Sequence, residues 1–178
     1  MKNLVLISLA LVLLSSCQTS NLAVDYDNAY DFSKVKTYNY YTDNTVQMNR
    51  IDSANFVRNL DTALRAKGLV KDTENPDIFI ALQVYNREGN QTNTVNLGVG
   101  GGSGWFGLGT NVGIPIRKKI MDYSIQVDFD DAQTRTLVWT GKTSNSLSYN
   151  ASTDSKNSFY KTSVQSLLKK YPPQSKSG

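Results

Sequence analysis

The spacing of apolar residues along the chain predicts both strands and helices. Several segments alternate between apolar and polar residues, or are rich in β-branched and aromatic residues, as strands are. They are residues 22–27, 35–41, 78–85, 119–130 and 136–147. The alternation is clearest in 119–130, where Tyr123, Ile125 and Val127 face one way and polar residues stand between them. With 136–147 it predicts an antiparallel hairpin that has one face in water.

Two of these strands carry more specific expectations. In 78–85, the even positions from Ile78 to Val84 are apolar, and the odd positions are partly apolar too. This pattern predicts a strand that is central in its sheet and covered on both sides. In 136–147, we expect Leu137, Trp139 and Leu147 to share one face.

Two other segments have helical spacing. In 50–67, Val57, Leu60 and Leu64 recur at intervals of three and four. Asn49 is suited to cap this helix, and Gly68 to end it. A second helix is expected from about Asp154 until two consecutive prolines stop it. Its apolar stripe is Tyr160, Val164, Leu167, Leu168 and Tyr171.

The order of these elements predicts the fold class. Strands and helices do not alternate regularly, and an insertion of about thirty residues, 88–118, interrupts the strands. We therefore expect a single two-layer α+β domain over 22–173. Its sheet is mixed and mostly antiparallel, both helices pack on one face, and the glycine-rich insertion forms a hairpin or loop. Residues 174–178 are expected to be a disordered tail.

The N-terminal segment predicts where the protein resides. Lys2, an apolar core and the small residues before Cys17 are typical of a secretory signal peptide, here 1–16. The core is shorter than the roughly 20 apolar residues that span a bilayer. The ending Leu14-Ser15-Ser16-Cys17 resembles the lipobox of bacterial lipoproteins, which implies that Cys17 is lipidated. The alternative is an ordinary secretory signal with a chance cysteine. Under the lipobox interpretation, residues 17–21 form the lipidated cysteine and a short tether.

Composition narrows the chemistry. The chain has no histidine and one cysteine, so the usual neutral-pH base and the Cys/His metal ligands are missing. Removing 1–16, which contain Lys2, lowers the formal net charge from +4 to +3, and no run of five basic residues exists. Nucleic acid binding is therefore not indicated. We expect a protein that is not an enzyme and that uses no cofactor or metal.

The insertion 88–118 is the unusual segment. Residues 94–99 and 111–116 alternate like strands, with a glycine-rich stretch between them. Three interpretations remain open: a mobile loop, an arm that docks on a protein partner or a second copy by strand addition, or a tip that enters the bilayer interface. The candidate contact residues at the tip are Trp105, Phe106 and Leu108.

Two side-chain clusters have alternative interpretations. Asp128, Asp130 and Asp131 form either a calcium or magnesium site or, as we prefer, a charged turn. Tyr38, Tyr40 and Tyr41 favour sheet packing over a sugar-binding platform.

The mature chain resembles bacterial lipoproteins that share the domain of unknown function 4136. The matching pieces are Val24-Asp25-Tyr26-Asp27, Asp31-Phe32-Ser33-Lys34, Leu64-Arg65-Ala66-Lys67-Gly68-Leu69, Asn75-Pro76-Asp77-Ile78, Asp130-Asp131-Ala132, Leu137-Val138-Trp139-Thr140-Gly141 and Tyr171-Pro172-Pro173. The resemblance implies an α+β lipoprotein, common in Gram-negative bacteria and in the Bacteroidetes in particular. It implies no reaction.

These observations lead to two functional hypotheses. The first is a non-enzymatic lipoprotein, anchored in the outer membrane and facing the periplasm, that binds or scaffolds a partner through the glycine-rich arm. The outer membrane is favoured by analogy, because Gln18 follows the cysteine instead of Asp. The alternative is a small-ligand carrier or hydrolase that uses Asp or Tyr groups in a pocket between sheet and helices.

Overall fold

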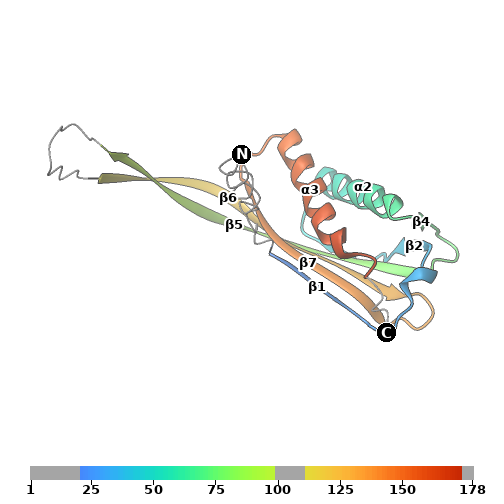
Figure 1. Ribbon diagram of the computed structural model, residues 1–178. Helices are drawn as coiled ribbons and strands as arrows, with labels where there is room; N and C mark the ends of the chain where they lie inside the picture. The colour runs from blue at the N-terminus through green and yellow to red at the C-terminus, as the bar shows by residue number, and fades with distance from the viewer. Residues whose placement is uncertain (1–20, 99–110, 174–178) are drawn as a thin grey trace, which may run out of the picture.

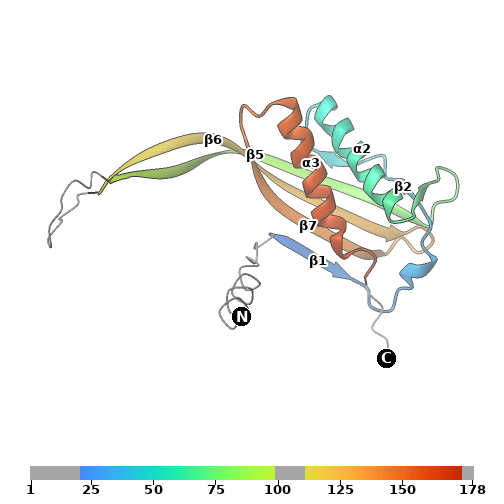
Figure 2. The same ribbon diagram turned by 45° about the horizontal axis from the view of Figure 1, so that its top comes forward.

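The computed structural model describes residues 21–98 and 111–173, and in this part of the chain one sheet carries both helices on the same face (Figures 1 and 2). The strands are β1 (Leu22–Tyr26), β2 (Thr37–Tyr40), β3 (Thr45–Val46), β4 (Val70–Lys71), β5 (Ile78–Gly98), β6 (Asn111–Asp131) and β7 (Leu137–Ser148). The helices are α2 (Arg50–Ala66) and α3 (Thr153–Leu167), with short 3-10 turns at Phe32–Lys34 and Leu168–Lys170. The two-layer α+β class is confirmed.

The strand order is β1-β7-β6-β5-β2-β4, with β3 paired to β5 off this path. The pairs β1–β7, β7–β6 and β6–β5 are antiparallel. Strands β2 and β3 run parallel to β5, and β4 runs parallel to β2. The sheet is therefore mixed and mostly antiparallel, as the order of elements predicts.

Helix α2 begins and ends where its sequence indicates. The Asn49 side chain accepts a hydrogen bond from the backbone N–H of Asp52 at 2.9 Å, which caps the first turn. Gly68 ends the helix with φ of +88°, a conformation that glycine adopts without strain. Phe56, Leu60 and Leu64 of this helix are fully buried against the sheet layer.

Helix α3 is capped by Ser152, whose hydroxyl accepts from the backbone N–H of Ser155 at 3.2 Å. Its predicted stripe, Tyr160, Val164, Leu167, Leu168 and Tyr171, is buried throughout. The stripe therefore orients the helix, because packing this apolar surface against the sheet removes it from water.

Strand β5 is central, but it is not covered on both sides as we expected. The even positions from Ile78 to Val84 are buried under the helices, whereas Tyr85 on the opposite face is 46% exposed. The prediction was wrong because both helices pack on one face and leave the other to solvent (Figure 2). Phe79, at one of the odd positions, packs locally instead. Its ring stacks on that of Tyr41 with the centroids 5.2 Å apart, and the guanidinium carbon of Arg135 lies 4.3 Å from the Phe79 ring centroid.

A β-bulge changes the predicted facing of β7. Phe129 pairs with Trp139, whereas Asp130 pairs with Leu137, so Val138 is an extra residue. Val138 and Trp139 are buried, but Leu137 is 53% exposed. The expectation that Leu137 and Trp139 share one face was therefore wrong, because the bulge shifts the alternation by one position.

The insertion is built on two very long strands. Strands β5 and β6 continue through 88–98 and 111–118, and their pairing runs without interruption from Ile78 opposite Asp131 to Gly98 opposite Asn111. For these flanking residues the loop interpretation was wrong and the hairpin interpretation is confirmed. The far ends of both strands project well beyond the helices (Figures 1 and 2).

Candidate functional site

The predicted contact residues fall outside the described part of the chain. Cys17, Trp105, Phe106 and Leu108 belong to residues 1–20 and 99–110, so their predicted roles stay predictions. The described residues do place the strands that lead to the tip. We call Gly89–Gly98 together with Asn111–Lys119 the arm.

The arm is a ribbon of two strands. On one side, β3 supports β5 only as far as Val46, which pairs with Val84. On the other side, β7 supports β6 only as far as Ser148, which pairs with Ile120. Beyond these points the described strands pair with each other alone. Ten residues of strand span about 33 Å, so the arm is comparable in length to a small domain.

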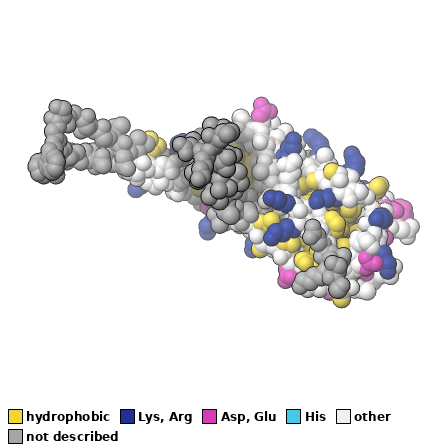
Figure 3. All heavy atoms as spheres, in the orientation of Figure 1, with side chains coloured by type: hydrophobic (Ala, Val, Ile, Leu, Met, Phe, Trp, Pro, Cys, Tyr) yellow, Lys and Arg dark blue, Asp and Glu magenta, His cyan; other side chains and the backbone are white. Residues whose placement is uncertain are grey.

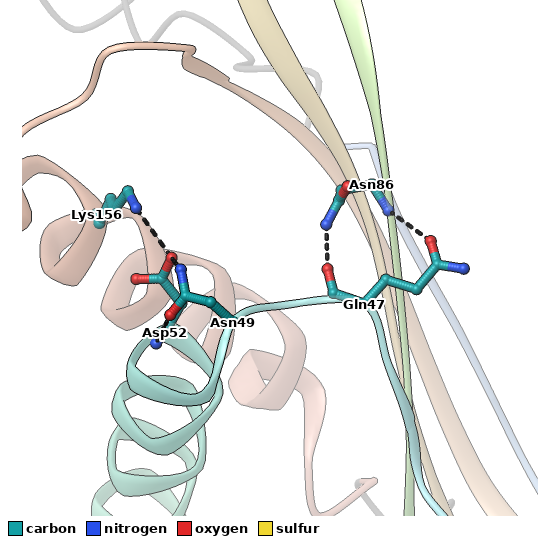
Figure 4. Close-up of polar contacts among 5 residues, drawn as sticks. All are labelled: Gln47, Asn49, Asp52, Asn86 and Lys156. Atoms are coloured by element: carbon teal, nitrogen blue, oxygen red, sulfur yellow. Dashed lines mark hydrogen bonds and ion pairs between the residues drawn. The ribbon is translucent and has the colours of Figure 1, made fainter.

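Side-chain contacts hold each strand of the arm where it leaves the sheet. On the β5 side, the Asn86 side-chain amide donates to the backbone carbonyl of Gln47, and the backbone N–H of Asn86 donates to the Gln47 side chain (Figure 4). On the β6 side, Asp122 accepts a hydrogen bond from Ser146 at 2.6 Å and lies 3.6 Å from the Arg87 side-chain nitrogen. The base of the arm is therefore tied to β3 and β7.

Gly89 stands at this base for a steric reason. A Cβ atom at position 89 would lie 2.9 Å from a carboxylate oxygen of Asp122 and 3.3 Å from the side chain of Ile120. A side chain at this position would require the Asp122 carboxylate, and with it the contact to Arg87, to shift.

A hollow of about 510 Å³ lies between the arm's base and the first turns of α2 and α3. Among the described residues that line it, Asp52 is the only one with a carboxylate. This side chain, on a residue that is 7% exposed, is bound by Lys156 at 2.9 Å and by the Asn49 amide at 2.7 Å (Figure 4). The neighbouring Tyr160 hydroxyl is buried and has no hydrogen-bond partner within the part of the chain that the structure describes. Burial raises its pKa, as do Tyr123 and Asp52 beside it. The Asp52–Lys156 pair therefore joins α2 to α3. Because the carboxylate is already paired with a cation, we interpret this arrangement as a structural contact and not as a ligand site.

The predicted acidic cluster does not converge on one point. Asp128 accepts hydrogen bonds from Gln126, whereas Asp130 accepts one from the Tyr41 hydroxyl at 3.0 Å. Asp131 is bound by groups of its own turn. Within residues 21–98 and 111–173, no group of three or more acidic, histidine or cysteine side chains is placed to hold a metal ion.

The tyrosine cluster packs the sheet onto a helix. The hydroxyls of Tyr38 and Tyr40 both donate to one carboxylate oxygen of Asp61 in α2, at 2.8 and 2.6 Å. Burial raises the pKa of both hydroxyls, and the Asp61 charge raises it further. Tyr41 points the other way and stacks on Phe79.

The family model for DUF4136, a domain of unknown function, matches residues 22–173. The chain belongs to the DUF4136 family. We call the described residues outside the arm, 21–88 and 120–173, the body. The matched range runs from the first residue of β1 to the prolines that follow α3, so it includes nearly the whole body and the arm. No match is found among curated proteins.

Two solved structures share the fold with this DUF4136 protein. One is a PDZ domain protein from Parabacteroides distasonis, with 14% identity and a TM-score of 0.57, and the match covers 87% of this chain but only 36% of that one. The other is PelC from Paraburkholderia phytofirmans, a dodecamer, with 10% identity, a TM-score of 0.50 and coverage of 84% and 95%. The chain thus spans about a third of the PDZ domain protein and almost all of PelC.

Several contacts at the base of the DUF4136 arm have no signal in the sequence. Gln47 and Asn86 are 39 residues apart, and Asp52 and Lys156 are 104 apart. Only the Asn49 cap was predicted, because a cap is local to its helix.

Among the described residues neither helix has the length and apolar character needed to cross a membrane.

Proposed function

We propose that this DUF4136 protein is a non-catalytic lipoprotein, held at the outer membrane by Cys17, whose arm binds a protein partner. The observation that carries the proposal is the arm itself. Among residues 21–98 and 111–173, the arm is a ribbon of two strands with no third strand and no helix behind it, and such a ribbon is marginally stable in water. Packing against another protein would stabilise such a ribbon, and we therefore infer that a partner covers the arm.

The exposed groups of the arm suit strand addition. Within the described side chains, those of Asn90–Thr94 and Pro115–Lys119 are exposed. Beyond the reach of β3 and β7, the backbone N–H and C=O groups on the two outer edges face no other strand of the described part of the chain. An added strand would satisfy these groups, which is the physical basis of β-augmentation.

The anchor supports a position close to the membrane. Residues 18–21 span at most about 14 Å when fully extended, and β1 begins at Leu22. Two or more acyl chains hold a protein stably, whereas one chain holds it reversibly. The body would therefore lie near the lipid headgroups while the arm extends about 33 Å from it.

The distribution of charge on the visible face of the body does not favour binding to nucleic acid or to a strongly anionic surface. Lys and Arg side chains are spread over the visible face of the body, with Asp and Glu between them (Figure 3). A nucleic acid site would gather the cations into one patch or stripe.

The ligand-carrier or hydrolase alternative has less support. Fully buried side chains such as Phe56, Ile80, Trp139 and Tyr160 fill the space between sheet and helices. The hollow beside Asp52 is open at the edge of this layer, and its carboxylate is paired with Lys156. PelC, which shares the fold, is a dodecamer, and this too favours an assembly role over catalysis.

The test separates the anchor from the arm. Cys17→Ser in the full chain should move the protein from the membrane fraction to the soluble fraction, and mass analysis of the unaltered protein should find acyl chains on Cys17. Replacing residues 92–117 by Asn-Gly joins Gln91 to its cross-strand partner Lys118 through a favoured two-residue turn.

We expect this shortened chain to stay folded and membrane-bound but to lose the proteins that crosslink to the unaltered chain in intact cells. A shortened chain that keeps every crosslink would refute the role of the arm. A free thiol at Cys17 would refute the anchor.

A further inference from the structure

The two edges of the arm are chemically different. Between Gly89 and Gly98, β5 contains no charged residue and no proline, whereas β6 carries Pro115, Arg117, Lys118 and Lys119 at the same depth. Prolines and lysines are the usual protection of an exposed edge strand, because proline lacks the N–H donor and like charges repel a second copy. The β6 edge is therefore protected and the β5 edge is not.

The hydrogen bonds at the base show which backbone groups face the free β5 edge. Even positions of β5 bond outward: the Ile80 carbonyl accepts from Tyr41 at 3.0 Å, the Val84 carbonyl accepts from Gln47 at 2.8 Å, and the Asn86 N–H donates to Gln47. Figure 4 shows the last of these contacts, at the point where the edge becomes free. Since strand geometry repeats every two residues, the next outward positions are Glu88, Asn90, Thr92 and Thr94.

The same reasoning places the proline on the other edge. The carbonyl of Lys119 accepts from Tyr149 at 3.1 Å, and the N–H of Asp131 donates to Thr136 at 2.9 Å, so odd positions of β6 bond outward. Pro115 is therefore an outward position that has no N–H to offer. A strand that approached the β6 edge would lose that bond and meet three cations.

We propose that the β5 edge of the arm pairs antiparallel with the same edge of a second copy of this chain. The inference rests on the proposed function, because it names the partner that the arm binds. In a register centred on Thr92, each Thr92 lies opposite the other, and Asn90 lies opposite Thr94. Threonine pairs across strands are favourable, and the neutral edge brings no like charges together.

Charge makes a second copy the partner that fits best. Pairing through β5 gives a four-stranded ribbon in the order β6-β5-β5-β6, so the cationic strands lie on its two outer margins. Three interstrand spacings separate them by about 14 Å, more than the Debye length of about 8 Å at physiological salt. A symmetric antiparallel pair also closes on itself, so it gives a dimer and not a fibre. An acidic peptide would instead be attracted to the β6 edge, where proline blocks pairing.

Thiol crosslinking in the full chain tests this register. Thr92→Cys on the β5 edge should form a disulfide-linked dimer in oxidised membranes, because directly opposed residues have Cα atoms about 5.5 Å apart. The matched control is Arg117→Cys, since Arg117 is the cross-strand partner of Thr92 on the opposite edge. It should not form the dimer, and the unaltered chain shows the contribution of Cys17. Equal crosslinking of the two variants, or none at Thr92→Cys, would overturn the inference.

A charge exchange provides a second readout. Chains with Thr92→Lys and with Thr92→Glu should each lose self-association, measured by co-purification of two differently tagged copies from detergent extracts. Expressing the two variants together should restore it, because opposite charges then meet across the two-fold axis. Undiminished association of Thr92→Lys with itself would contradict the proposal.

The outcomes distinguish this inference from the proposed function. If the shortened arm loses its crosslinked partners but Thr92→Cys gives no dimer, the arm binds a different protein and only the present inference fails. If the shortened arm loses nothing, both fail.

Discussion

At the scale of single residues, Trp139 shows how closely the core is fitted to one sequence. It is fully buried and contacts the rings of Phe129 and Tyr171, with centroids 4.7 and 5.5 Å away. Its six-membered ring also covers Gly141, where an added Cβ would lie 2.5 Å from the indole. Gly141 thus provides the space into which the indole packs.

We therefore expect Gly141→Ala to lower the free energy of unfolding by about 2 kcal/mol, because overpacking displaces the indole. Urea unfolding followed by tryptophan fluorescence measures this. Lys142→Ala, an exposed neighbour on the same strand, is the control and should change stability little. An unchanged Gly141→Ala midpoint would mean that the indole moves aside at no cost.

The lowered pKa values of two aspartates, Asp77 and Asp131, indicate how the stability of the fold depends on pH. Burial raises the pKa of Asp77, but the backbone N–H groups of Lys36 and Thr37, each 2.8 Å away, outweigh it, so the pKa is lowered overall. The pKa of Asp131 is lowered mainly by the backbone N–H of Thr134. A carboxyl whose folded pKa is lowered stabilises the fold above its unfolded pKa of about 4. That contribution is lost as pH falls through the folded value.

We expect the free energy of unfolding to fall as pH drops from about 4 toward 2. Asp77→Asn should make this dependence shallower, because the amide binds no proton in this range. Urea titrations at several pH values measure the slope. The same slope in both proteins would show that the Asp77 carboxylate is not a source of the acid sensitivity.

At the scale of elements, α2 and α3 are joined by one largely buried ion pair. The Asp52 side chain is 10% exposed, the Lys156 side chain is 31% exposed, and their charged atoms are 2.9 Å apart. Removing one partner of a buried pair leaves the other charge without compensation, which costs more than the pair itself contributes.

Lys156→Met should therefore lower the free energy of unfolding by about 2 kcal/mol, less than for a fully buried pair because Lys156 is partly solvated. Adding Asp52→Asn should recover part of this loss, since the amide needs no cation. A double-mutant cycle in urea measures the coupling. Lys161→Met, at an exposed position of α3, is the control. Additive effects of the two changes would contradict a functional ion pair.

At the scale of the whole molecule, the body and the arm are separate in their energetics. All of the buried core residues lie in the body, and none of the described side chains of the arm is among them. The body accordingly has the helices, the core and the polar contacts at Asp61 and Asp77, whereas the described arm has its own ladder and, at its base, the hydrogen bond from Tyr149 to Lys119.

Replacing residues 92–117 by Asn-Gly should therefore leave the thermal unfolding midpoint of the body within about 2 °C, because a change of 1 kcal/mol would shift it by a few degrees. Circular dichroism at increasing temperature measures this. A midpoint lowered by ten degrees or more would mean that the arm is part of the cooperative fold.

Much of the fold was predictable because its determinants are local. The stripe of α3, the cap at Asn49 and the alternation of Tyr123, Ile125 and Val127 each depend on residues within a few positions. The strand character of 94–98 and 111–116 was visible in the same way. Leu137 was misplaced because a bulge is set by the partner strand, and alternation within one strand does not reveal it.

The sequence by itself determined that this chain has two amphipathic helices, a hairpin with one wet face and a glycine-rich insertion, because periodicity is a property of neighbouring residues. Only the tertiary structure decided that both helices cover one face of β5, that Asp52 meets Lys156, and that β3 and β7 stop at Val46 and Ser148. These features depend on pairing between distant segments, and they leave a two-stranded arm with one protected edge and one open edge.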